Sequence, residues 1–123
     1  MLPPSHNRAY QDLSTLLTEF ESFLVAQGQK NSQSETRLEF QNLTEWFKQN
    51  IADLSQEDLD LAIAPRWQSL QTEIKREFKL LSTDILFLSS ARQKATQIKR
   101  INTISDRLAK LIGYCQIMLN DSN

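Results

Sequence analysis

The hydrophobic residues of this 123-residue chain recur at intervals of three and four, which places them on one face of an α-helix. In the first such segment the pattern begins at Tyr10 and reaches Leu24. The same pattern predicts four helices, over residues 6–26, 35–53, 66–91 and 95–119. The residues that we expect to be buried between them are Leu17, Phe47, Ile74, Phe78, Leu81, Ile85, Leu108 and Cys115.

The last two segments carry the longest apolar stripes. The stripe of the third segment consists of Trp67, Leu70, Ile74, Phe78, Leu81, Ile85 and Leu88. The stripe of the fourth consists of Ile98, Ile101, Ile104, Leu108, Leu111, Cys115 and Met118. Such stripes are typical of helices that pack against each other in coiled-coil fashion.

Polar and helix-breaking residues separate the segments. Ser5 is placed to cap the first helix, and residues 28–34 form a polar loop. Ser55 followed by Asp58 resembles a capping box and predicts a short helix, which meets Pro65. Because proline cannot donate a backbone hydrogen bond, we expect a break or kink there.

These elements predict an all-α fold, an antiparallel bundle of three to four amphipathic helices with a long third helix after Pro65. The whole chain, residues 1–123, is expected to form this single domain. Composition agrees, because the chain has only 2 glycines and 3 prolines, too few turn residues for a β-rich domain.

Charge is divided unevenly along the chain. Residues 1–60 contain four Lys/Arg and ten Asp/Glu, whereas residues 61–123 contain ten Lys/Arg and five Asp/Glu. One interpretation is that the two halves attract each other within the bundle. The other is that the basic half faces an acidic partner.

The residue types needed for catalysis are scarce. His6 is the only histidine and is expected near a frayed end, and Cys115 is the only cysteine and falls within an apolar stripe. The carboxylates of Glu57, Asp58 and Asp60 fit the first turn of a helix better than acid–base chemistry. We therefore expect no enzyme activity, no metal and no cofactor. No apolar run is long enough to span a membrane, and we expect a cytoplasmic protein.

The third helix carries a second line of residues that its core stripe does not explain. Arg76, Leu80, Thr83 and Phe87 lie on the side opposite the core stripe, flanked by Lys75, Lys79 and Leu86. Either this helix is buried on two sides, or the line is an exposed apolar strip edged by cations, as in many protein-binding surfaces. The burial of Leu80 and Phe87 distinguishes these alternatives.

Several short stretches of the sequence are informative as a set. They are RWQSLQTEI from Arg66, LLSTDILFL from Leu80, then Ala91-Arg92-Gln93, Asp106-Arg107-Leu108 and LIGYC from Leu111, together with the opening Met1-Leu2-Pro3. These stretches resemble the cyanobacterial PatD family. The resemblance covers mainly residues 66–119, and none of these stretches is a chemical motif. Lys94 stands where the family resemblance leads us to expect a proline between the last two helices.

The resemblance implies a developmental role, the control of heterocyst frequency in filamentous cyanobacteria through contact with the cell-division protein FtsZ. FtsZ-type proteins carry acidic surfaces, which a basic partner surface would complement. The leading hypothesis is therefore a helical adaptor that modulates FtsZ assembly. Its partner-binding residues would be Lys75, Arg76, Lys79, Leu80, Thr83 and Phe87 of the third helix and Lys99, Arg107 and Lys110 of the fourth.

Two other functions remain open at this point. The same cations could bind nucleic acid, although they are spread over two long helices without a helix-turn-helix. Alternatively, the second line of the third helix could complete a larger bundle in a purely structural homodimer.

Overall fold

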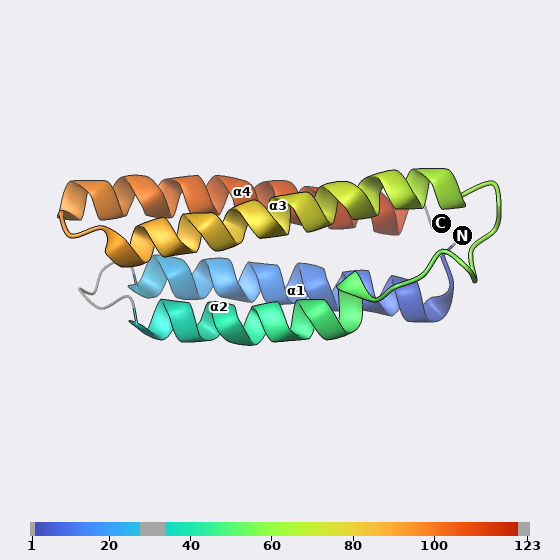
Figure 1. The fold of residues 1–123 in the computed structure, drawn as a ribbon, viewed down its shortest axis with the longest axis horizontal. Helices are drawn as coiled ribbons and strands as arrows, with labels where there is room; N and C mark the ends of the chain where they lie inside the picture. Colours follow the sequence, from blue (N-terminus) through green and yellow to red (C-terminus); the bar gives the residue numbers. More distant parts are fainter. Residues whose placement is uncertain (1, 28–33, 121–123) are drawn as a thin grey trace.

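The computed structural model describes residues 2–27 and 34–120, and within these ranges it contains helices and turns but no strand. The helices are α1 (Pro4–Gln27), α2 (Ser34–Phe47), its π-helical continuation η1 (Lys48–Ala52), α3 (Ala64–Ser90) and α4 (Lys94–Asn120). Successive helices run in opposite directions, so the predicted antiparallel all-α bundle is confirmed (Figure 1). Of the predicted loop 28–34, only Ser34 lies within the described residues, and it begins α2.

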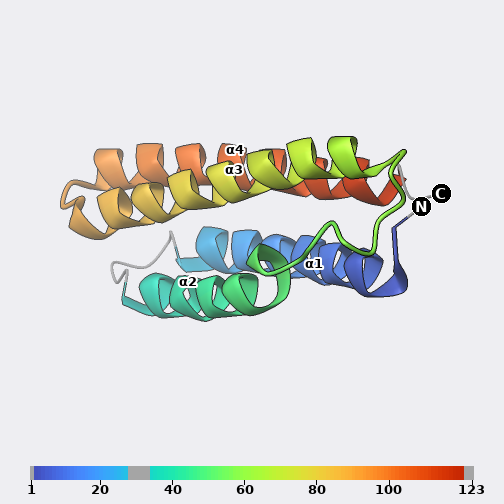
Figure 2. The same cartoon turned by 45° about the vertical axis from the view of Figure 1, so that its right-hand side comes forward.

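The bundle has two layers, one made of α1 and α2 and the other of α3 and α4 (Figures 1 and 2). The most extensive packing is that of α4 against α3 and against α1, whereas α2 meets α3 over a shorter stretch. The start of α1 and the end of α4 lie at the same end of the bundle. Each layer therefore keeps a long outer face, and these two faces point away from each other.

The stripes predicted from the sequence form the core. All eight residues predicted to be buried are buried, and five of them, Leu17, Ile74, Leu81, Leu108 and Cys115, have no exposed surface. The prediction of burial is wrong for one stripe residue, Ile98, which is 49% exposed. The gaps from Ile98 to Ile101 and from Ile101 to Ile104 are both three residues. At about 100° per residue they rotate Ile98 by roughly 120° from the buried Ile104.

Phenylalanine rings join α2 to the rest of the core. The ring of Phe78 on α3 is stacked on that of Phe47, with centroids 3.9 Å apart, and on that of Phe40, at 5.5 Å. Phe40 in turn contacts Phe20 of α1 at 5.7 Å. These contacts bring α1, α2 and α3 together at one level of the bundle, where the ring of Phe78 lies between helices of both layers.

A buried hydrogen-bond network lies nearer the end at which α3 begins. The indole N–H of Trp67 donates to the Tyr10 hydroxyl at 2.8 Å, and this hydroxyl donates to Gln71 Oε1 at 2.7 Å. Gln71 Nε2 then donates to the carbonyl of Ile51 in η1 at 2.8 Å. The network satisfies polar groups that would be costly to bury alone, and it connects α1, α3 and η1.

The connection between η1 and α3 differs from the prediction. Residues 53–63 form turns in place of the short helix predicted after Ser55. The Ser55 hydroxyl accepts a hydrogen bond from the Glu57 N–H, two residues away, which is typical of a turn and not of a helix cap. His6, expected at a frayed end, is buried and donates from Nε2 to the Ser55 carbonyl at 2.8 Å. Its ring also packs against that of Trp67 in a T-shaped arrangement, with ring centroids 5.8 Å apart. These contacts hold the connection against α1, which itself begins at Pro4, before the predicted cap Ser5.

Both ends of α3 are defined by specific residues. Pro65 lies in the first turn of α3, where its missing N–H has no intrahelical partner to lose, so it begins this helix and does not break one. After α3, the turn 91–93 leads directly into α4. Gln97 Nε2 donates to the Ala91 carbonyl at 3.1 Å, so a glutamine side chain bridges this turn. Lys94, where the family resemblance predicted a proline, is the first residue of α4.

The aromatic stack predicts a large effect of removing its central ring. We expect Phe78→Ala to lower the free energy of unfolding by about 3–5 kcal/mol, because Phe78 is buried and its loss leaves a cavity between α2 and α3. Urea denaturation followed by circular dichroism measures this change. Leu86→Ala on the same helix is the control and should change stability by less than about 0.5 kcal/mol, because Leu86 is exposed. Equal losses for the two variants would contradict the described packing of α3.

Candidate functional site

The second line of α3 lies on the surface. We call Arg76, Leu80, Thr83 and Phe87 the α3 strip; their spacings of four, three and four place them on one side of the helix. Leu80 is 36% exposed and Phe87 is 47% exposed, and Leu86 beside them is more exposed still. In the single chain α3 is therefore buried on one side only, and the alternative of burial on two sides is wrong. The strip offers apolar contact area to another molecule.

Cations lie along the strip. Lys75, Arg76 and Lys79 are exposed on α3, as the sequence predicted. Arg76 Nη1 lies 3.3 Å from Glu73 Oε2 and 3.8 Å from Glu77 Oε1, but most of its side chain remains in solvent. Such surface ion pairs are weak, so Arg76 can exchange these carboxylates for those of a partner at little cost.

A cation from α4 completes the strip near its end. The guanidinium carbon of Arg100 lies 4.8 Å from the centroid of the Phe87 ring, a cation–π contact. Arg100 is not among the cations predicted from the sequence. Antiparallel helices joined by a short turn bring together residues equally distant from that turn, but Phe87 lies four residues before the turn 91–93 and Arg100 seven residues after it. Spacing from the turn alone therefore does not identify this pair.

Two predicted partner-binding residues have a different role in the structure. Arg107 Nη1 lies 2.7 Å from Glu77 Oε2, and its Nε lies 2.6 Å from Asp84 Oδ2. Lys110 Nζ lies 3.0 Å from Glu77 Oε1. Both cations therefore bind α3 from α4, an intramolecular role that differs from the partner contact predicted from the sequence. Lys99, the third cation predicted on α4, is exposed.

Glu77 is the centre of this ion cluster, although its side chain is only 1% exposed. Burial opposes its ionisation, but the hydrogen bonds and charges of Lys110 and Arg107 outweigh burial and hold the pKa of the Glu77 carboxyl below its ordinary value. The hydrogen bond to Glu77 likewise raises the pKa of Lys110. This buried carboxylate holds α4 against α3 through its ion pairs. Because it is buried and already paired, it is not placed to exchange protons with a substrate.

Two further ionisable side chains, those of Cys115 and Tyr10, lie in the core. Cys115 is fully buried, and burial raises the pKa of its thiol to about 12, so the thiol is not ionised at neutral pH. Burial also raises the pKa of the Tyr10 hydroxyl, despite its hydrogen bond from Trp67. Within residues 2–27 and 34–120 no three His, Cys, Asp or Glu side chains gather as metal ligands. No helix of this part is long and apolar enough to cross a bilayer.

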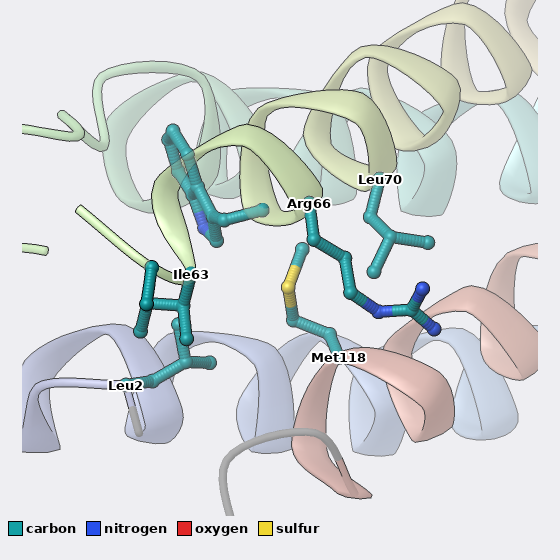
Figure 3. Close-up of a pocket in the computed structure, with 7 residues that line it drawn as sticks. Leu2, Ile63, Arg66, Leu70 and Met118 are labelled. Carbon is teal, nitrogen blue, oxygen red and sulfur yellow. The ribbon is translucent and has the colours of Figure 1, made fainter. Parts of the chain in front are cut away.

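A small cavity lies at the end of the bundle where α3 begins and α4 ends (Figure 3). Its volume is about 170 Å³, and it is lined by Leu2, Ala62, Ile63, Arg66, Trp67, Leu70 and Met118. All of these side chains except that of Arg66 are apolar, and none is a carboxylate, a histidine or a thiol. The cavity can hold an apolar group, but its own side chains supply no acid, base or nucleophile.

Comparisons with protein-family models, with curated proteins and with solved structures found no significant match to this chain.

The Glu77 cluster predicts a dependence of stability on pH. The pKa of Glu77 in the folded protein lies below its value in the unfolded chain, about 4.3. Glu77 therefore adds stability that is fully present above that pH and is lost as the pH falls through the lower folded pKa. Urea denaturation at pH values from about 3 to 7 should show the free energy of unfolding of the wild type falling on acidification.

In Glu77→Gln this loss should be smaller, because the titrating group is gone. At neutral pH the same variant should be less stable than the wild type by roughly 1–3 kcal/mol, less than for a fully buried pair, because Arg107 reaches solvent. Glu73→Gln, which removes an exposed carboxylate from the same helix, is the matched control. A Glu77→Gln profile parallel to that of the wild type would show that this carboxylate does not titrate as described.

Proposed function

We propose that this protein is a non-catalytic adaptor that acts in the cytoplasm by binding the division protein FtsZ and modulating its assembly, and that it thereby influences heterocyst frequency. The observation that carries the binding role is the exposure of Leu80 and Phe87 on α3 beside Arg76, Lys79 and Arg100. The resemblance of residues 66–119 to the PatD family supports the identity of the partner.

The chemistry of the α3 strip suits an acidic protein partner. Leu80 and Phe87 are seven residues, or about two helical turns, apart on the same side of α3. Both side chains can enter apolar depressions of a partner, where most of the binding energy of an interface is gained. The surrounding cations would increase the association rate with an acidic surface and fix its orientation. The cation–π contact with Arg100 would limit the motion of the Phe87 ring and so reduce the side-chain entropy lost on binding.

The proposed surface is smaller than the one predicted from the sequence. It consists of Lys75, Arg76, Lys79, Leu80, Thr83 and Phe87 on α3 together with Arg100 and Lys99 on α4. We leave out Arg107 and Lys110, because their charges are bound to Glu77 and Asp84.

Charge reversal tests the cationic part of this surface. We expect Arg76→Glu with Lys79→Glu to weaken binding to purified FtsZ by about tenfold or more, mainly through slower association, with a weaker dependence on salt. The melting temperature should change little, because both residues are exposed. Biolayer interferometry at several salt concentrations gives both rate constants. Arg37→Glu with Lys48→Glu is the control, since it changes the net charge equally on α2 and η1.

Truncation of the aromatic ring tests the apolar part. Phe87→Ala should weaken FtsZ binding while lowering the free energy of unfolding by less than about 1 kcal/mol, because the ring is half exposed. Leu38→Ala, an exposed leucine on α2, is its control. Unchanged affinity of both strip variants would exclude this surface. Tight binding of the wild type to duplex DNA at physiological salt, with none to FtsZ, would instead establish a nucleic-acid-binding regulator.

A further inference from the structure

The two layers of the bundle carry opposite charge. In α1 and α2 there are two arginines and six carboxylates, a net charge of −4, whereas α3 and α4 contain nine Lys/Arg and four carboxylates, a net charge of +5. The ion pairs of Arg8, Arg76, Arg107 and Lys110 each stay inside one layer. These pairs therefore do not use the opposite charges to hold the layers together. Glu19, Glu39 and Glu45 of the first layer are exposed.

A groove with aromatic walls runs between α1 and α2 in this acidic layer. Its volume is about 310 Å³, and it is lined by Leu16, Glu19, Phe20, Phe23, Glu39, Asn42, Leu43 and Trp46. Phe20 and Leu43 are buried and form its base, whereas Leu16, Phe23 and Trp46 are partly exposed along its walls. The lining covers two turns of each helix, from Leu16 to Phe23 and from Glu39 to Trp46, or about 10 Å at ~1.5 Å per residue.

Glutamates stand at both edges of the groove. Glu19 on α1 and Glu39 on α2 are exposed, and neither forms an ion pair with another residue of the described ranges. Arg8, which is the only Lys or Arg of α1, is paired with Asp12 at 3.6 Å. The carboxylates at the groove therefore keep their charge available for a molecule that enters it.

We propose that the groove between α1 and α2 binds a basic amphipathic helix of a second protein. A third helix laid along two neighbouring helices inserts the side chains of its positions i, i+4 and i+7, which span the length of this groove. Its apolar side chains would contact Phe20, Phe23 and Leu43. Lysines or arginines beside them would pair with Glu19 and Glu39, and one could lie over the indole ring of Trp46.

The charge of the groove selects this occupant. An acidic or neutral helix would desolvate Glu19 and Glu39 without compensation, which disfavours it. The basic helix leaves the α3 strip uncovered, because the α1–α2 layer and the α3–α4 layer face opposite ways (Figure 2). One molecule could thus bind a basic partner and an acidic partner at the same time. The proposal does not depend on FtsZ binding.

Model peptides test the groove in the full chain. The probe is a fluorescein-labelled amphipathic helix of leucine and lysine, about 14 residues long and therefore about 21 Å, and its counterpart has glutamate in place of lysine. Fluorescence anisotropy should show saturable binding of the lysine peptide that weakens with salt, and no binding of the glutamate peptide. Equal binding of the two peptides would overturn the proposal.

Two double variants localise the binding. Glu19→Gln with Glu39→Gln should weaken binding of the lysine peptide roughly tenfold, because both edge charges are removed. Glu21→Gln with Glu45→Gln removes two carboxylates from the same helices outside this groove and should leave affinity within about twofold of the wild type. Equal losses would indicate attraction to the whole acidic layer and would overturn the site.

Trp46→Ala tests the apolar wall and should also weaken peptide binding, with its folding checked by thermal melting.

The variant Arg76→Glu with Lys79→Glu separates the groove from the α3 strip. It should bind the peptide as well as the wild type does, so failure of the α3 strip and failure of the groove give different results. Concentration-dependent self-association in sedimentation, lost in Glu19→Gln with Glu39→Gln, would assign the groove to a second copy of this chain and overturn the proposal of a different partner.

Discussion

The buried carboxylate of Glu77 determines which side of α3 is free. Arg107 and Lys110 bind it from α4, and Arg107 also binds Asp84, seven residues further along the same face of α3. Together with the buried apolar stripe of α3, these contacts hold the helix in one rotation about its own axis. With Glu77 and Asp84 turned toward α4, and Phe78 stacked on Phe47, the remaining side of the helix must face solvent. The α3 strip is exposed as a consequence, so the proposed binding surface and the internal ion cluster are two results of one orientation.

The sequence predicts the core well because burial is periodic. Spacings of three and four identified the buried face of each helix, including Ile74 and Leu108, without knowledge of any neighbour. The same rule failed at Ile98, where two consecutive gaps of three rotate the stripe out of the core. The rule also contains no information about charged residues at the edge of a stripe. Glu77 lies beside the core residue Phe78, and only the position of α4 decides that it is buried and paired.

The features that the sequence could not predict depend on contacts between distant segments. Turns at 53–63 stand in place of the expected short helix, and the Ser55 carbonyl within them accepts a hydrogen bond from His6, about fifty residues away. Arg107 and Lys110 looked like free surface cations because an isolated helix does not show what lies opposite. The exposure of Leu80 and Phe87 was likewise undecided until the packing of α3 was known. The sequence therefore predicts which residues form the strip, but not whether each side chain is exposed, buried or paired with another residue.

The separation of charge into layers gives the molecule an electrical polarity across its short axis. Roughly four units of opposite charge are held on helix layers about 10 Å apart. This distance is close to the Debye length at physiological ionic strength, about 8 Å, so a large charged body far away experiences almost no net field from the nearly neutral chain. Within the last few ångströms of an encounter the two faces become distinguishable, and the resulting torque rotates the bundle about its long axis. This torque would turn the α3–α4 face toward an acidic partner of the kind proposed above.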